Sequence, residues 1–139
     1  MNKKLLLASI AFAISLTSLS AANKAPFLIN GVMPHYTKDI KMNWDNKELA
    51  LNDSQKDKLL VVRQDTMKNV MSLKKEIAPL EEEVASKIKA GATPEELMPL
   101  VEKIAKLKSS ATKAHLGCLY RTQNILSKKQ LKVLNKLAN

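Results

Sequence analysis

One apolar stripe at helical spacing dominates the middle of this chain. Its members are Leu59, Val62, Val70, Leu73, Ile77, Leu80, Val84 and Ile88. The first and last members are 29 residues apart, which is close to eight turns of an α-helix at about 3.6 residues per turn. The stripe therefore predicts one long helix from about residue 53 to residue 90, with this stripe facing the core.

Proline and glycine residues mark where this helix is disturbed and where it ends. Pro79 lies inside the stripe and lacks a backbone N–H, so we expect it to kink or split the helix. Gly91 is placed to end the helix, because glycine readily adopts the left-handed conformation found there. The segment Thr93-Pro94-Glu95-Glu96 then has the pattern of a capping box with proline at the first helical position. This pattern predicts the start of a second helix.

A second apolar stripe follows this helix start. Its members are Leu97, Leu100, Val101, Ile104, Leu107, Ala111, Ala114 and Cys118. Pro99 and Gly117 are unfavourable in a helix interior and weaken the pattern near its two ends. A short final helix is predicted from about Lys128 to Leu137, where leucines recur every three residues. Because the link between the two long helices is short, we expect them to form an antiparallel hairpin.

The composition supports an all-α fold. The chain has 139 residues, which fits one ordinary domain. It contains only 3 glycines and 4% aromatic residues, whereas a β-sandwich needs many turn residues and many aromatic or β-branched residues. We therefore expect an all-α protein, built as a long antiparallel helical hairpin with short flanking helices.

The N-terminus has the pattern of a secretory signal peptide. Lys3 and Lys4 precede an apolar run over residues 5–16, and small residues follow as far as Ala22. The run is shorter than the roughly 20 residues that a membrane-spanning helix needs. Cleavage after Ala22 would leave 117 residues with a net charge of +8. We therefore expect an exported protein without a stable membrane anchor.

The exported part divides into two segments. Residues 23–47 contain two of the prolines and a glycine, and we expect a loosely ordered segment with one short helix from about Pro34 to Met42. Residues 48–139 hold the two apolar stripes and the final helix, and we expect them to form the helical domain.

Two similar pentapeptides open the first long helix and the final helix. In each, a leucine precedes a capping side chain, and a glutamine lies three residues after the cap: Leu51, Asn52 and Gln55 in one, Leu126, Ser127 and Gln130 in the other. The capping oxygen can accept from the backbone N–H of the glutamine, whose amide can reach back to the N–H of the cap. Each pentapeptide alone is typical of an ordinary helix cap.

Together, in a small, basic, helical and exported chain, the two pentapeptides resemble the paired LTxxQ motifs of the Spy/CpxP family. Asn52 and Ser127 replace the usual threonine, and both keep the capping chemistry. The resemblance implies a cradle-like helical homodimer in the periplasm, acting as an ATP-independent chaperone or a stress-response accessory protein. It also implies that related proteins bind or sense metal ions. The family has no catalytic site that could be assigned to this chain.

Three apolar residues of the first long helix lie off its core stripe. Leu60, Met67 and Met71 lie about 80 to 120° from Leu59 around the helix axis, and Arg63 and Lys74 border them. Flexible methionines beside positive charge suit the weak binding of varied unfolded proteins. We expect these five residues to bind client proteins, unless they pack against another helix or a partner subunit.

His115 and Cys118 are the candidate metal ligands. They lie three residues apart on the second predicted helix, so their side chains can face the same way, and both suit zinc or copper. Two ligands make no tight site alone, so a dimer would supply the rest. Two alternatives stay open: Cys118 is a buried apolar residue of its stripe, or it forms an intermolecular disulfide.

Catalysis and nucleic-acid binding are disfavoured. The chain has no nucleophile, phosphate-loop or zinc-protease motif, and few aromatic side chains accompany its positive charge. The resemblance implies, and the basic charge and off-stripe methionines favour, a periplasmic, ATP-independent chaperone for unfolded or misfolded proteins in envelope stress. The alternatives are a periplasmic metal-binding or metal-sensing accessory protein, and an inhibitor that docks on an envelope-stress sensor kinase.

Overall fold

The computed structural model describes residues 24–138, and within them the chain is all-helical. Its helices are α2 (Tyr36–Met42), α3 (Asp53–Lys89), α4 (Pro94–Ile125) and α5 (Lys128–Leu137). The predicted signal peptide over residues 1–22 lies outside the described residues. Among the described helices, none is both long enough and apolar enough to cross a membrane.

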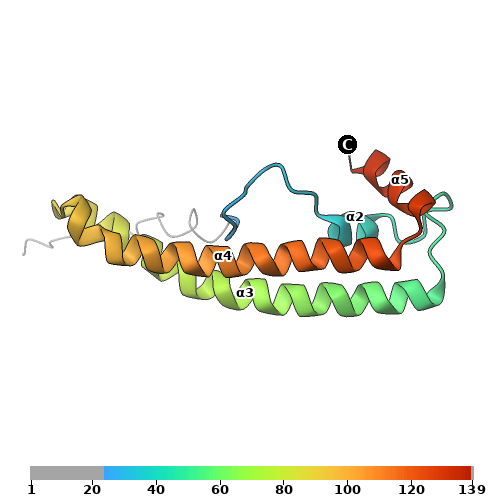
Figure 1. The fold of residues 1–139 in the computed structure, drawn as a ribbon, viewed down its shortest axis with the longest axis horizontal. Coiled ribbons are helices and arrows are strands. Elements are labelled where there is room, and N and C mark those ends of the chain that lie inside the picture. The colour runs from blue at the N-terminus through green and yellow to red at the C-terminus, as the bar shows by residue number, and fades with distance from the viewer. Residues whose placement is uncertain (1–23, 139) are drawn as a thin grey trace, which may run out of the picture.

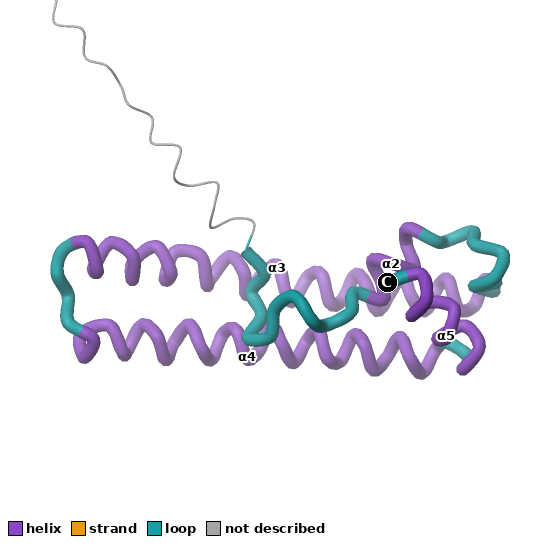
Figure 2. Tube along the Cα trace, turned by 90° about the horizontal axis from the view of Figure 1, so that it is seen from above, coloured by secondary structure: helices purple, strands orange, loops and turns teal. Residues whose placement is uncertain are grey.

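The two long helices form the predicted antiparallel hairpin (Figures 1 and 2). Pro79 does not split α3, which continues through it as one helix of 37 residues. Proline removes one backbone hydrogen bond there, while α3 stays packed along α4. Pro99 and Gly117 likewise lie inside a continuous α4.

The first long helix ends at the glycine, as predicted. Gly91 adopts a φ of 86°. The Gly91 N–H donates to the Ile88 carbonyl over 3.0 Å, and the Ala92 N–H donates to the Lys87 carbonyl over 3.0 Å. These two bonds form a Schellman motif, which satisfies the last carbonyls of α3.

The core lies at the end of the hairpin where α2 and α5 pack (Figure 1). It joins α2, the loop after it, the first turns of α3 and the last helix through Tyr36, Ile40, Leu49, Leu59, Leu126 and Leu134. The Tyr36 hydroxyl donates to Asn135 Oδ1 over 2.8 Å, which ties α2 to α5. The short first helix begins at Tyr36 rather than at the predicted Pro34.

The segment before α2 runs along α4 toward this core (Figure 2). Pro26 is buried, and the Leu28 N–H donates to Thr112 Oγ1 over 2.9 Å. The Phe27 ring lies 4.8 Å from the His115 ring, measured between centroids. These contacts hold residues 26–28 on the middle of α4, and the exposed segment that follows arches away from α4 before α2 begins (Figure 1).

The far end of the hairpin is built differently. We call residues 78–102 the tip, and residues 24–77 with 103–138 the body. No side chain of the tip is buried. The tip carries six acidic and two basic side chains, a net charge of −4, whereas the body carries seven acidic and nineteen basic side chains, a net charge of +12. The molecule is therefore strongly polarised along its length.

Candidate functional site

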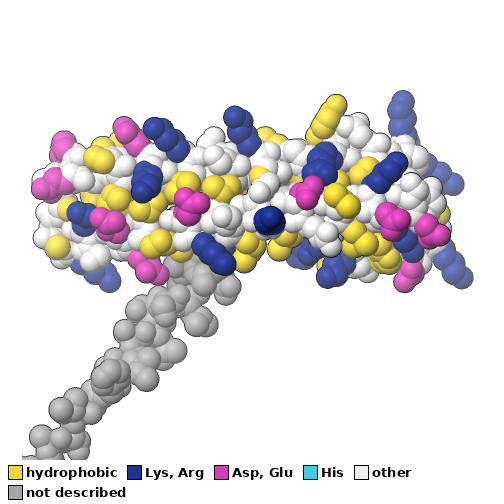
Figure 3. Space-filling view, turned by 90° about the horizontal axis from the view of Figure 1, so that it is seen from below, with side chains coloured by type: hydrophobic (Ala, Val, Ile, Leu, Met, Phe, Trp, Pro, Cys, Tyr) yellow, Lys and Arg dark blue, Asp and Glu magenta, His cyan; other side chains and the backbone are white. Residues whose placement is uncertain are grey.

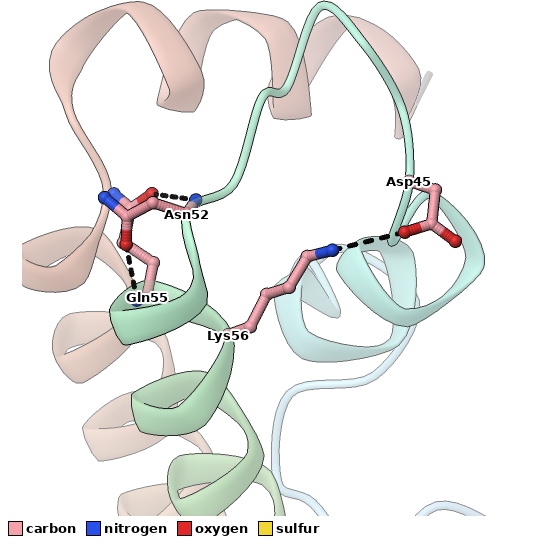
Figure 4. A network of polar contacts seen from close by, with 4 residues as sticks. All are labelled: Asp45, Asn52, Gln55 and Lys56. Carbon is pink, nitrogen blue, oxygen red and sulfur yellow. Dashed lines mark hydrogen bonds and ion pairs between the residues drawn. The ribbon is translucent and has the colours of Figure 1, made fainter.

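Both predicted capping boxes are present. Asn52 Oδ1 accepts from the Gln55 backbone N–H over 2.8 Å, and the Asn52 N–H donates to Gln55 Oε1 over 3.2 Å (Figure 4). Ser127 Oγ accepts from the Gln130 N–H over 3.1 Å, and the Ser127 N–H donates to Gln130 Oε1 over 2.9 Å. The two helix starts therefore use the same chemistry.

The two capping glutamines also bind each other, which the separate motifs do not predict. Gln55 Nε2 donates to Gln130 Oε1 over 2.8 Å, and Gln130 Nε2 donates to Gln55 Oε1 over 2.9 Å. Their remaining amide hydrogens go to main-chain carbonyls, at Ile125 over 3.0 Å and at Leu49 over 3.0 Å. Each side-chain amide therefore uses both donors and accepts twice, which fixes which atom is oxygen and which is nitrogen.

The main-chain carbonyls that accept hydrogen bonds from Gln130 Nε2 lie in a strained turn. Gln130 Nε2 lies 3.2 Å from the Ala50 carbonyl as well as 3.0 Å from that of Leu49. Ala50 has a φ of 44°, in the left-handed region that disfavours residues with a Cβ. The amide pair therefore holds the loop before α3, the start of α3 and the start of α5 together. This arrangement is structural, because none of its groups can act as an acid, a base or a nucleophile.

The predicted client-binding residues lie on α3 with much of their apolar surface in solvent. Leu60, Met67 and Met71 are 44 to 45% exposed, and Arg63 and Lys74 are half-buried beside them. Val61, which sequence analysis did not select, is 52% exposed. On the face drawn in Figure 3, apolar side chains lie in several patches along the length of the hairpin, interspersed with charged side chains.

A groove opens between α2 and α3 at one end of this row of side chains. Its volume is about 360 Å³, and its lining includes Leu60, Arg63 and the half-buried Trp44. Lys56 Nζ lies 5.5 Å from the centroid of the Trp44 ring and pairs with Asp45 Oδ1 at 3.2 Å (Figure 4). The Trp44 ring therefore has a paired lysine ammonium within cation–π distance.

The first of the two predicted metal ligands, His115, is buried on α4 beneath the segment before α2. The His35 ring stacks on it with centroids 4.8 Å apart and an angle of 11° between the ring planes. Burial lowers the pKa of His115, a positive charge on His35 lowers it further, and a hydrogen bond with the Pro34 carbonyl opposes both effects. Among the described residues, no hydrogen-bond partner reaches His115 Nδ1.

Cys118, the second predicted metal ligand, is buried on α4, as expected if it belongs to the apolar stripe of that helix. Its Sγ lies 3.9 Å from Thr37 Oγ1, so its polar neighbour belongs to α2. Within residues 24–138, no three His, Cys, Asp or Glu side chains are grouped closely enough to hold a metal ion. The residue that the sequence pattern missed is His35, because a pairing across 80 positions has no local signal.

Comparisons with known proteins place this chain in no family. No family model matches it, and neither a curated protein nor a solved structure does so.

Proposed function

We propose that this protein is a periplasmic, ATP-independent chaperone that holds unfolded or misfolded proteins during envelope stress. The observation that carries the proposal is the row of half-exposed apolar side chains on α3. Leu60, Met67 and Met71 follow one line of the helix surface, at spacings of seven and four residues. Each of the three side chains keeps 44 to 45% of its surface in solvent within the described chain.

The chemistry of this row suits weak and varied binding. Methionine side chains are flexible and polarizable, so they adapt to apolar groups of different shape. Arg63 and Lys74 lie beside the row, and the body as a whole has a net charge of +12. Positive charge attracts acidic segments of an unfolded chain over a Debye length of about 10 Å, and apolar contact then holds them.

We further propose that the working form is a cradle-like homodimer. The tip has a net charge of −4 and contains the exposed Ile88 and Met98, while the body has a net charge of +12. Opposite charges favour an antiparallel arrangement, in which the tip of one copy lies against the body of the other. Analytical ultracentrifugation should then detect a dimer that weakens as the salt concentration rises.

Light scattering of an aggregating denatured protein tests the chaperone proposal. The purified protein should suppress aggregation near stoichiometric ratios, with EDTA present and without ATP. The double variant Met67→Glu, Met71→Glu should lose this suppression. The matched control Val32→Glu, Met42→Glu replaces two other exposed apolar side chains, away from both the α3 row and the tip, and should keep it. Equal suppression by both double variants would exclude the α3 row as the client surface.

The metal-binding alternative keeps one supporting observation, the unpartnered Nδ1 of the buried His115 beside His35. A zinc or copper ion there would need further ligands, such as those of a second copy. Aggregation suppressed only when zinc is added, and lost in His115→Ala, would favour this alternative. The docking of the protein on one sensor kinase domain, with no suppression in either condition, would favour the inhibitor alternative.

A further inference from the structure

The groove between α2 and α3 combines an apolar floor with an aromatic wall. Ile40 and Leu59 line it and are almost completely buried, so its floor is part of the core. Trp44, the only tryptophan of the chain, forms a wall, and Leu60 lies at the solvent side. A volume of about 360 Å³ is within the usual range for small-molecule pockets, about 300 to 1,000 Å³.

Two cations without an ionic partner line the same groove. Lys41 comes from α2 and Arg63 from α3, and no acidic side chain contributes to the lining. In the described part of the chain, neither cation has an ion pair, whereas the nearby Lys56 is paired with Asp45. The groove therefore offers positive charge that its own lining does not neutralise.

We propose that this groove binds a small amphiphilic anion, namely a free monocarboxylate on an apolar chain. The apolar chain would lie on Ile40, Leu59 and the indole of Trp44. The carboxylate would lie between Lys41 and Arg63, because a guanidinium matches the two oxygens of a carboxylate and an ammonium adds a point charge. This inference goes beyond client binding, since the ligand is a small molecule and the binding site is a single groove.

Trp44 fluorescence reports directly on the groove. The test is a titration of the purified protein with dodecanoate below its micelle concentration, followed by tryptophan emission and by calorimetry. We expect a saturable shift of the emission with one site per chain. Dodecyltrimethylammonium has the same chain and the opposite charge, and we expect it not to saturate this site.

Arg63→Gln should weaken dodecanoate binding about tenfold, and adding Lys41→Gln should weaken it further. The matched control is Lys58→Gln, which removes a cation of α3 that lines a different groove. Circular dichroism of each variant checks that the helices are retained. Equal affinity for the cationic and anionic ligands, unchanged binding in Arg63→Gln, or no binding by either method would overturn the proposal.

The aggregation assay gives an independent result on the same samples. Suppression of aggregation without dodecanoate binding would overturn this inference and leave the chaperone proposal intact. Binding of dodecanoate without suppression of aggregation would do the opposite. A peptide with a C-terminal apolar residue that displaces dodecanoate, at lower concentration than dodecanoate itself requires, would reassign the groove to peptide carboxylates.

Discussion

The body and the tip are both built on α3 and α4, but they differ in how their side chains are buried. In the body, α2 and α5 cover the hairpin, the core side chains are buried, and two capping boxes bind each other. In the tip, two helices pack with no third element among the described residues, and every apolar side chain keeps contact with solvent. The body therefore supplies the cooperative stability, and within the described chain the tip depends on local helix signals.

The local signals of the tip are correspondingly strong. Thr93 Oγ1 accepts from the Glu96 N–H over 3.3 Å, and the Thr93 N–H donates to Glu96 Oε2 over 2.8 Å. Lys108 of the body pairs with Glu81 of the tip across the two helices, which ties the tip to the body. A cap contributes about 1 kcal/mol, so the capping box fixes the start of α4 without burying a core, and the half-buried ion pair joins the two helices.

The largest expected contrast comes from shortening one leucine in each region. Leu134 is fully buried in the body, so Leu134→Ala should lower the free energy of unfolding by about 2 to 5 kcal/mol. Leu100 is only half-buried in the tip, so Leu100→Ala should cost about 1 kcal/mol or less. Urea denaturation followed by circular dichroism measures both. Similar losses for both variants would mean that the tip shares the core of the body, and the comparison would fail.

Replacing Gln130 by glutamate tests how much the amide pair contributes to the stability of the body. In Gln130→Glu, a carboxylate oxygen replaces the amide that donates to Gln55 and to the Leu49 carbonyl, which should cost about 2 to 3 kcal/mol at pH 7. Burial among acceptors should raise the pKa of the new carboxyl in the folded state. The lost stability should therefore return in part as the pH falls through that raised pKa, because the protonated carboxyl can donate again.

Gln64→Glu is the matched control for this substitution, since it makes the same change of side chain at an exposed position of α3. It should change stability by less than about 0.5 kcal/mol. A pH-independent loss in Gln130→Glu, or an equal loss in Gln64→Glu, would contradict the network.

The stacked histidines should make the stability of the body depend on pH. The pKa of His115 is lowered by burial and by His35, so the unfolded chain binds a proton more readily than the folded one. Stability should accordingly be complete above the ordinary histidine pKa of about 6.5 and should fall as the pH drops through it. Thermal melts at pH 8, 7, 6 and 5 would detect this slope. The slope should shrink in His115→Gln, and one that His115→Gln leaves unaltered would belong to other groups.

The smallest expected effects differ in sign between the regions. Ala50→Gly should stabilise the body by up to about 1 kcal/mol, because glycine relieves the positive φ of 44°. Ala85→Gly lies within α3 in the tip and should destabilise by about 1 kcal/mol, because glycine disfavours a regular helix. Differential scanning calorimetry resolves the two directions. A loss of stability in Ala50→Gly would show that the loop before α3 gains from its alanine.

The sequence predicts the parts of this molecule that depend on near neighbours. The long helices, the three capping boxes and the glycine at the turn each have a signal within a few residues, and each is present. The stacking of His35 on His115 and the pairing of Gln55 with Gln130 join positions about eighty residues apart. No local pattern specifies such contacts, because they depend on how the helices are brought together.

At Pro79, a local rule predicts a disturbance of the helix that packing along α4 overrides. Proline disfavours a helix interior, yet α3 runs through it without a break. The row of Leu60, Met67 and Met71 lies off the core stripe, and each of its side chains keeps 44 to 45% of its surface in solvent. The spacing of apolar residues places the row on the helix surface, but it does not encode which molecule, if any, binds there.

The amide pair also has a consequence for the order of folding. Each capping box joins residues only three apart, so each can form within microseconds once its helix starts. The bonds between Gln55 and Gln130 close a loop of 75 residues, so they can form only after the hairpin has folded back on itself. During synthesis, Gln55 is made first, and the amide hydrogen that it donates to Gln130 has no protein acceptor in that pair until α5 is made. The final segment of the chain is thus the one that completes the beginning of the domain.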